Sequence, residues 1–425
     1  MQTGEVEAKA RLLKQYGFEP DDEIWLPDEK VGKLAKDARP DQLARAKGRN
    51  LREVIPAGKG RFSAGDKGVE EYLGRIRSGQ TCGMQSALSL HNTEHSWDPT
   101  RPATLIIAAG GPSLANNLGE LRKLVKRGAK VIAVNKTHDY LVKRGIPVDY
   151  AALLDPKDWV ADYIDPTLKE SRSVRKEMGR GWVDTKYLIA SQCHDSTINK
   201  FKRRKDSYLY HAAAGLGEKD VLKNEFKGQP WICITGGSVI GLRAINLGYG
   251  LGFRKFHTFG LDGSARMPPE TEMAKLFTLL CQAGMCEWMN PEPPTQTEIV
   301  STVFKLARGR KKFPDAANEI MRKYLYSYAK PHIDSTWSAF TIDLKTGWSR
   351  SYLANHHMAR SVYEFEDSLR EWDGNIRSGK MEPFNLVVHG DPEQSAIAMV
   401  AAGMGIHADA EQNAKHGKAP HEQAA

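Results

Sequence analysis

The sequence predicts an α/β protein built on a Rossmann-like, doubly wound and mostly parallel sheet, with a helical N-terminal extension and α+β C-terminal additions. Three observations predict this fold class. Short apolar runs recur through the middle of the chain, which is typical of strands buried on both faces of a parallel sheet. Segments with helical periodicity separate these runs. Two of the runs end in a Gly-Gly turn that opens a helix, at the edge where such sheets bind ligands.

The stretch 103–155 supplies the first half of this plan. Its first apolar run stops at the turn Gly110-Gly111-Pro112-Ser113, and Asn117 with Glu120 has the spacing of a capping pair for the helix that follows. The predicted elements are a strand, a helix, a strand, a helix and a strand: 104–109, 118–125, 130–134, 137–143 and 150–154.

A second stretch repeats the same order of strand, glycine turn, helix and strand. We expect its turn and the first one to flank the crevice where the strand order reverses. Further strands are expected before and after it. The predicted elements are strands 186–190, 207–211, 231–234, 255–260 and 384–388, and the helix 239–247.

Composition shifts divide the chain into four parts. We predict an N-terminal arm and helical extension over 1–99, a Rossmann-like core over 100–265, C-terminal additions over 266–405 and a disordered tail over 406–425. Within the flanking parts the sequence predicts helices and one hairpin. These are helices over 6–16, 68–96, 273–289 and 299–306, and a hairpin over 334–352.

Charge and cysteine content restrict the class of protein. The chain has 425 residues, a net charge of +9 and five scattered cysteines, which fits a reducing compartment. No apolar run is long enough to cross a bilayer, so we expect a cytoplasmic protein without a membrane partner. Basic runs at 122–130, 202–205 and 305–312 are solvated faces or contacts to phosphate-rich partners. They lack interleaved aromatic residues, which disfavours nucleic-acid binding.

Polar residues at the expected strand ends form the candidate site. Backbone N–H groups in a glycine turn that opens a helix bind anions, and serine hydroxyls add donors. Carboxylates at strand ends hold Mg²⁺ through phosphate oxygens or act as a base, although aspartate also caps turns. The nucleotide-side candidates are Gly110, Gly111, Pro112, Ser113, Asn135, Gly236, Gly237 and Ser238, and the catalytic and metal candidates are Asp155 and Asp262.

Several common enzyme classes do not fit these motifs. The first turn is not G-x-G-x-x-G, and the second strand ends in Asn135-Lys136 instead of the acidic residue of a nicotinamide dehydrogenase. The chain contains neither a P-loop nor a G-x-S-x-G nucleophile elbow. Cys281 and Cys286 do not have the spacing of a metal-binding CxxC pair. The scattered histidines are expected to be packed or solvated.

The string LIIAAGGPSL at 105–114, with VIAVN at 131–135 and GIPVDY at 145–150, resembles a known family. That family joins the archaeal 6-hydroxymethylpterin diphosphokinase (MptE-like) proteins and the bacterial motility accessory factors. TGGSV at 235–239 and FGLDG at 259–263 are similar to its later block. The resemblance covers about 100–265, and its Gly-Pro-Ser-Leu turn is also similar to that of bacterial sialyltransferases.

The resemblance implies a nucleotide-binding core whose members differ in reaction. The pterin enzymes transfer diphosphate from ATP with Mg²⁺, and the motility factors are linked to moving a nonulosonic sugar onto flagellin. It places the Gly110–Ser113 turn and Asn135 on the nucleotide side, and Asp155 and Asp262 on the metal or acceptor side. Relatives that stand alone on bacteriophage genomes also occur, and a phage-encoded member would suit this chain, although nothing in its composition shows that origin.

We therefore expect a nucleotide-dependent transferase, most similar to a diphosphokinase that moves diphosphate from ATP to a small hydroxymethyl acceptor such as a pterin. Its partners are a nucleotide and a small-molecule acceptor, and Mg²⁺ is its expected cofactor. One alternative is a glycosyltransferase that uses a nucleotide sugar. The other is a non-catalytic, phage-associated binding protein whose basic runs contact nucleic acid or an acidic partner.

Overall fold

The structure is a computed structural model. It describes two short strands near the N-terminus and most of the chain from residue 82 to residue 408. The described residues are 23–26, 31–34, 82–91, 103–168, 184–212, 232–234, 236–237, 239–287, 292–308, 312–324, 338–343, 349–354 and 356–408.

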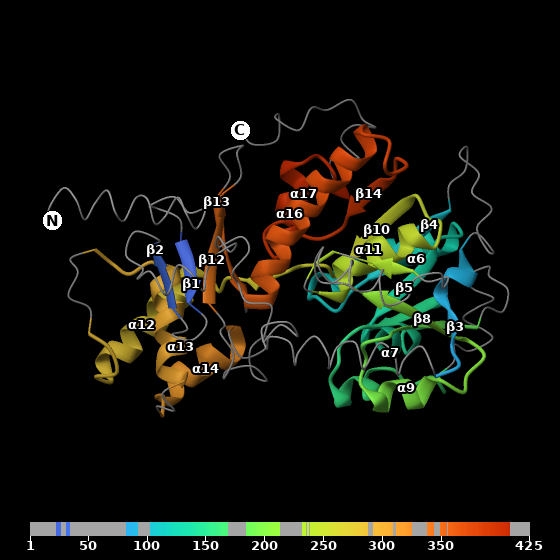
Figure 1. Ribbon diagram of the computed structural model, residues 1–425. Helices are drawn as coiled ribbons and strands as arrows, with labels where there is room; N and C mark the ends of the chain where they lie inside the picture. The colour runs from blue at the N-terminus through green and yellow to red at the C-terminus, as the bar shows by residue number, and fades with distance from the viewer. Residues whose placement is uncertain are drawn as a thin grey trace, which may run out of the picture.

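A nine-stranded parallel sheet forms the larger lobe of the described chain (Figure 1). Eight strands follow the order β14-β10-β4-β5-β6-β7-β8-β3, and β9 pairs with β8 beside this path. The central strands are buried on both faces, as their apolar runs predict. The strands are β3 (Gln85–Ser86), β4 (Thr104–Ala108), β5 (Lys130–Val134), β6 (Tyr150–Leu153), β7 (Lys186–Ala190), β8 (Ser207–Ala212), β9 (Cys233–Ile234), β10 (Lys255–Phe259) and β14 (Asn385–Val388).

Helices cover both faces of this sheet. The chain moves from β4 to β8 in one direction and then returns through α11 to β10 on the other side of β4. Right-handed crossovers in opposite directions place their helices on opposite faces, so the sheet is doubly wound and the predicted fold class is confirmed. The helices are η2 (Ala87–Leu90), α5 (Ser113–Asn116), α6 (Leu118–Lys126), α7 (Thr137–Val142), η3 (Asp158–Tyr163), α9 (Asp195–Phe201), α11 (Ile240–Gly250), α16 (His356–Arg377) and α17 (Ala396–Gly403).

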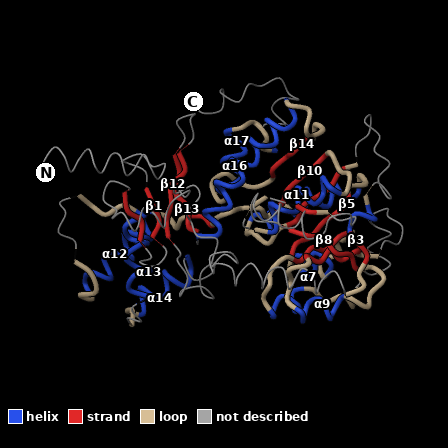
Figure 2. Tube along the Cα trace, in the orientation of Figure 1, coloured by secondary structure: helices blue, strands red, loops and turns tan. Residues whose placement is uncertain are grey.

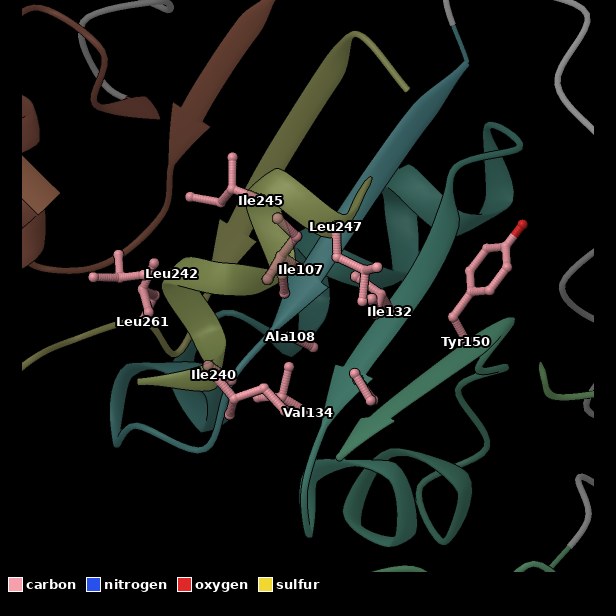
Figure 3. Packing of buried hydrophobic residues seen from close by; sticks show 14 of the residues in the cluster. Ile107, Ala108, Ile132, Val134, Tyr150, Ile240, Leu242, Ile245, Leu247 and Leu261 are labelled. Carbon is pink, nitrogen blue, oxygen red and sulfur yellow. The ribbon is translucent and has the colours of Figure 1, made fainter. Parts of the chain in front are cut away.

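Helix α11 covers the centre of the sheet. Figure 3 shows Ile240, Leu242, Ile245 and Leu247 of this helix beside apolar side chains of β4 and β5. All four are buried in the large apolar cluster of the lobe. Because α11 runs against the direction of the strands, its N-terminal end lies at their carboxyl edge.

The C-terminal part of the chain completes the larger lobe. Strand β14 pairs in parallel with β10 and extends the sheet past the reversal. Helix α16 lies against α11, where the Trp372 indole N–H donates to Asn246 Oδ1 at 3.1 Å. The buried residues of α16 and α17 join the same apolar core as β4 and β10. Segments far apart in the sequence therefore share one core.

A second apolar core lies in a smaller lobe, which Figure 2 shows apart from the main sheet. Three helices pack against a small antiparallel sheet there. A separate two-stranded antiparallel sheet consists of β1 (Glu23–Leu26) and β2 (Val31–Leu34). The remaining elements are β11 (Ala265–Arg266), α12 (Glu270–Gln282), α13 (Gln296–Arg308), α14 (Asp315–Tyr324), β12 (Ser338–Asp343) and β13 (Ser349–Ala354).

Three local predictions are wrong, and one of them concerns the helix expected over 273–289, which ends at Gln282 as α12. The helix expected over 68–96 is absent from its described part, where Gln85 and Ser86 form the edge strand β3 and Ala87–Leu90 form a single 3₁₀ turn. The capping pair fails as well, because the Asn117 amide donates back to Ser113 O at 2.9 Å and makes no cap bond to α6.

Some expectations fall outside the described residues. These are the helix over 6–16, most of the extension before residue 82, Trp231, Ser238, the hairpin turn at 344–348 and the tail after residue 408. In the described part of the chain, no helix has the length and apolarity needed to span a membrane.

Candidate functional site

The strand order reverses between β4 and β10, so the turns after these two strands form the centre of the carboxyl edge. These turns carry Gly110–Ser113 and Gly260–Gly263. The strand before the second Gly-Gly turn, β9, pairs with β8 and does not itself flank the reversal. The second turn reaches this edge by a different route.

Helix α11 brings the second turn back toward β4. A Cβ atom on Gly241 would lie 2.6 Å from Leu261 Cδ1 and 3.4 Å from Ala109 Cβ, so the first turn of α11 lies directly on the ends of β4 and β10. The segment that precedes α11 therefore borders the candidate site through the helix and not through its own strand.

The glycines of the second turn are explained by packing under α11. A Cβ on Gly236 would lie 2.5 Å from Asn246 Nδ2, and one on Gly237 would lie 2.7 Å from Leu242 Cδ1. Both residues also have positive φ angles. Ser238 lies outside the described residues. A ligand contact by this turn stays a prediction.

Gly111 and Asp262 lock the first turn to the end of β10. A Cβ on Gly111 would lie 2.4 Å from Asp262 Oδ2 and 2.5 Å from Gly260 O, so only glycine fits this close approach. The Gly111 N–H donates to Gly260 O at 2.8 Å, and the Ser113 N–H donates to Asp262 Oδ2 at 2.8 Å. The two strands are thus joined beyond their last ladder bond.

The Asp262 carboxylate occupies the place that the sequence assigns to a phosphate oxygen. It accepts the Ser113 N–H, and both residues are almost fully buried, with 2% and 1% exposed. Burial raises the pKa of Asp262, and hydrogen bonding to Ser113 and then Ser395 partly offsets this effect. Two of the expected anion donors, the N–H groups of Gly111 and Ser113, are therefore bonded within the protein.

Gly110 differs from Gly111, because nothing in the fold requires it to be glycine. It is exposed, and a Cβ there would meet only Thr137 Oγ1, at an ordinary contact distance of 3.5 Å. Among the described residues no hydrogen bond to its N–H occurs. Pro112, which follows, is half-buried and has no N–H. The backbone at Gly110 is the accessible part of the first turn.

Asn135 ends β5 next to this opening. Its φ of 53° is left-handed, a conformation that asparagine tolerates better than most residues. The backbone bonds from Asn135 N–H to Ala152 O and from His138 N–H to Asn135 O fix the turn into α7. The side-chain Oδ1 is buried and has no hydrogen-bond partner among the described residues.

Asp155 and Arg243 supply the charges of the neighbouring part of the edge. Asp155 follows β6 and is half-buried, whereas Arg243 on α11 is 6% exposed and its Nε–H donates to Gly237 O at 2.8 Å. Both act electrostatically on the buried Tyr210, whose phenol donates to Leu153 O. A carboxylate and a guanidinium therefore lie around one buried phenol.

The two predicted metal ligands stand apart on this edge. Asp262 follows β10 and Asp155 follows β6, with β4 and β5 between them. Three strand spacings amount to about 14 Å, so one Mg²⁺ bound directly to both carboxylates does not fit. Among the described residues there is no cluster of three or more histidine, cysteine or acidic side chains that suits a metal ion. Mg²⁺ that is held mainly by substrate phosphates needs only one or two carboxylates.

Sequence reasoning missed Arg243 and Thr137. An arginine within the mostly apolar helix 239–247 was a usable signal, because a buried arginine requires acceptors. Thr137 lies two residues after Asn135 and faces Gly110. Of the basic run 202–205, Arg204 pairs with Asp206 at 2.7 Å, while its neighbours are exposed.

These observations define a Rossmann-like α/β protein with a candidate ligand site at the reversal of its strand order. Residues 82–266 match the family described as 6-hydroxymethylpterin diphosphokinase MptE-like. This segment is therefore an MptE-like domain, which confirms the resemblance seen in the sequence.

Two other comparisons add little. No curated protein matches the chain. Among solved structures, the chain is similar to MAf glycosyltransferase from Magnetospirillum magneticum AMB-1, with 14% sequence identity and a TM-score of 0.37. The match covers 67% of this chain and 31% of that one, so this chain spans less than a third of that structure's length.

Proposed function

We propose that this protein is a nucleotide-dependent transferase that binds the phosphates of its nucleotide at the Gly110 turn. The observation that carries the proposal is the open backbone of Gly110, an exposed glycine at which a Cβ would meet only Thr137 Oγ1, at 3.5 Å, and whose N–H has no partner among the described residues. It lies at the reversal of strand order, where doubly wound sheets bind ligands. The MptE-like family is named for a diphosphokinase.

The neighbouring polar groups suit a phosphate ester. Asn135 Oδ1 is an acceptor that is available to a ribose or base donor. Arg243 carries a permanent positive charge close to the edge, and its guanidinium suits phosphate oxygens. The carboxyl edge therefore offers a backbone donor at Gly110, an amide acceptor at Asn135 and a buried cation at Arg243.

Within this class we favour transfer of diphosphate from ATP to a small hydroxymethyl acceptor such as a pterin. Asp155 is the half-buried carboxylate at the end of β6, and it would hold Mg²⁺ together with the phosphate oxygens of the nucleotide. A bound Mg²⁺ would neutralise the negative charge that develops during phosphoryl transfer. Asp262 is buried against Ser113, so we assign it a positioning role on the turn.

A thermal-shift panel tests the proposal. ATP, GTP, CTP, CMP, UDP-sugars and GDP-sugars are compared with and without Mg²⁺, because a ligand of the native state stabilises it by about 2.7 kcal/mol at a hundredfold excess over Kd. We expect ATP with Mg²⁺ to raise the melting temperature. Release of AMP in the presence of 6-hydroxymethylpterin then identifies diphosphate transfer.

Two open glycines provide a matched pair of variants. Gly110→Ala should leave the melting temperature of the free protein unchanged and remove the nucleotide shift, because its new methyl group stands where the phosphates approach. Gly119 on α6 also has empty space around its Cα. Gly119→Ala should keep the shift. Equal shifts in both variants would exclude the Gly110 turn as the phosphate site.

The two aspartates should separate in the same assay. Asp155→Asn should lose the Mg²⁺-dependent part of the shift and the turnover, because the half-buried carboxylate is removed. Asp262→Asn keeps an oxygen acceptor for the Ser113 N–H and should retain both in large part. The reverse pattern would transfer the metal role to Asp262.

Other outcomes of the panel point elsewhere. A shift with CMP or a nucleotide sugar, and none with ATP, would favour glycosyl transfer. No shift with any nucleotide would favour a binding protein. In that case, steeply salt-dependent binding to DNA would identify the exposed residues of the 202–205 run as the contact.

A further inference from the structure

Two thiols lie side by side in the smaller lobe, far from the groups that the proposed function uses. Cys281 Sγ and Cys286 Sγ are 3.3 Å apart. Both cysteines are free and half-buried, and both pack against the second apolar core. A disulfide needs about 2.05 Å between its sulfurs, so a relative movement of about 1 Å would join them.

The end of helix α12 creates this proximity. The Gly284 N–H bonds to Cys281 O at 2.9 Å, and the Met285 N–H bonds to Leu280 O at 2.9 Å. Gly284 has a φ of +63°, which is left-handed and favours glycine. These features form a Schellman cap, in which the chain folds back over the last helical turn. Cys286, the next residue, therefore returns to the side of the helix that carries Cys281.

The pair is asymmetric. Burial, reinforced by the neighbouring sulfur of Cys281, raises the pKa of the Cys286 thiol to about 12. The raised pKa favours the protonated form of Cys286, and either thiol can be the donor in the contact between the two sulfurs. Cys281 is then the sulfur that attacks an external disulfide, and Cys286 is the second thiol that completes the reaction.

We propose that Cys281 and Cys286 form a redox-active dithiol, which a low-molecular-weight disulfide such as oxidised glutathione converts to an intramolecular disulfide at the end of α12. The Cys281 thiolate attacks one sulfur of the oxidant, whose S–S bond breaks and releases one glutathione thiolate. Cys286 then attacks the mixed disulfide and releases the second. Two electrons pass from the protein sulfurs to the oxidant, and the two thiol protons pass to the two glutathiones.

Local geometry makes this pair the expected target. Cys193 is 1% exposed within the main core and has no access to a dissolved oxidant. Cys82 is half-buried, and burial raises its pKa, which lowers its reactivity. Neither lies opposite a second sulfur in the described part of the chain. The intramolecular disulfide should therefore form at 281–286 before glutathione accumulates elsewhere.

Peptide mapping after oxidation tests the chemistry. Trypsin releases both cysteines in the peptide 276–305, which contains no internal lysine or arginine. After oxidised glutathione and denaturing alkylation with N-ethylmaleimide, this peptide should carry no label, and prior reduction should restore two labels. Two labels without reduction, or two attached glutathiones, would overturn the proposal. The Cys193 peptide should remain fully labelled.

Single variants test the order of attack. In Cys286→Ser, Cys281 should stop at the mixed disulfide and carry one glutathione, whereas Cys281→Ser should acquire glutathione at least tenfold more slowly. Equal rates would overturn the assignment of Cys281 as the first nucleophile. Thermal unfolding, measured by calorimetry, adds a structural readout. Oxidation should raise the transition of the smaller lobe in the parent protein and leave it unchanged in Cys281→Ser and Cys281→Ala. An unchanged transition temperature in the parent protein would exclude a stabilising disulfide at the end of α12.

Discussion

At the scale of single residues, the contact between Gly111 and Asp262 shapes the whole candidate site. It holds the turns after β4 and β10 together and fills the place where the sequence predicted a bound anion. The adjacent Gly110 remains open. Two successive glycines that look alike in the sequence thus have different roles, one in packing and one in the proposed ligand contact.

Gly111→Ala should destabilise the protein even without a ligand. The new Cβ would overlap Asp262 Oδ2 and Gly260 O. Neither atom can move aside easily, because the first belongs to a hydrogen-bonded carboxylate and the second to the backbone. Overpacking of this kind costs about 1–3 kcal/mol of the free energy of unfolding. Urea denaturation of Gly111→Ala and Gly110→Ala measures the difference. Equal midpoints would show that the close approach is not rigid.

Asp262 should make stability fall as pH rises through a limited range. Its folded-state pKa is raised by burial above the ordinary value of 3.8, so between these two pKa values the folded protein binds more protons than the unfolded chain. Stability from this group is therefore lost as pH rises through the folded-state pKa. Asp262→Asn removes the effect. Urea unfolding of both proteins from pH 4 to pH 7 should show the variant gaining stability relative to the parent, and parallel curves would contradict the buried carboxylate.

At the scale of elements, a pair of buried histidines joins β10 to the end of the C-terminal strand β14. His257 Nδ1 and His389 Nε2 are 2.8 Å apart, and the His389 ring stacks on Phe259 at 4.0 Å. Burial, followed by the nearby His257 and His407, lowers the pKa of His389 to about 3. One proton bridges the pair, so protonation of both rings would break the bond.

This pair should make the protein acid-sensitive. The folded-state pKa of His389 lies below its ordinary value of 6.5, so the unfolded chain takes up the proton first and stability falls as pH drops below 6.5. At pH 4.5 the loss amounts to about 3 kcal/mol. His389→Gln should lack this contribution. The measurement is urea unfolding at pH 7 and pH 4.5, in which an equal loss for both proteins would count against the pair.

The strands were easier to predict than the helices, for a physical reason. Strands β5 and β7 begin and end where their apolar runs do, because burial on both faces leaves no other place for such runs. Helix α16, which the sequence analysis omitted, mixes buried Phe365 and Trp372 with many charged side chains. The pairing of β14 with β10 is a long-range contact, and no local pattern specifies it.

The candidate site was predicted in outline only. The strand-end residues do lie on one carboxyl edge, since parallel strands bring their ends together. Which glycine is open, and which carboxylate is buried, depends on contacts such as Ser113 with Asp262 between segments far apart in the sequence. Arg243 was overlooked for the same reason, because its place on the edge follows from the packing of α11 across the sheet.

At the scale of the whole molecule, two apolar cores share one chain. The larger one includes β4, α11 and α17, and the smaller one lies among α12, α13 and α14. Helix α16 touches both, since Met358 packs on the smaller core and Val362 lies in the larger one. The lobes are therefore connected, although each buries its own side chains.

A core truncation should separate the two lobes energetically. Leu276 is 0% exposed in the smaller core, so Leu276→Ala should cost about 2–5 kcal/mol there. We expect calorimetry to show two transitions, with only one lowered by this variant. Leu121→Ala, in the larger core, is the matched control and should lower the other. A single transition that both variants shift would mean that the lobes unfold together.

The position of β14 has a consequence for synthesis on the ribosome. The edge of β10 stays uncovered until Asn385–Val388 have emerged, after the whole smaller lobe has been made. Phe256 and Phe259 of β10, both fully buried in the finished sheet, lack this neighbouring strand throughout that interval. The smaller lobe can fold during this delay. Its folding speed therefore decides how long the nascent chain exposes the unpaired edge of β10 to chaperones and to neighbouring ribosomes.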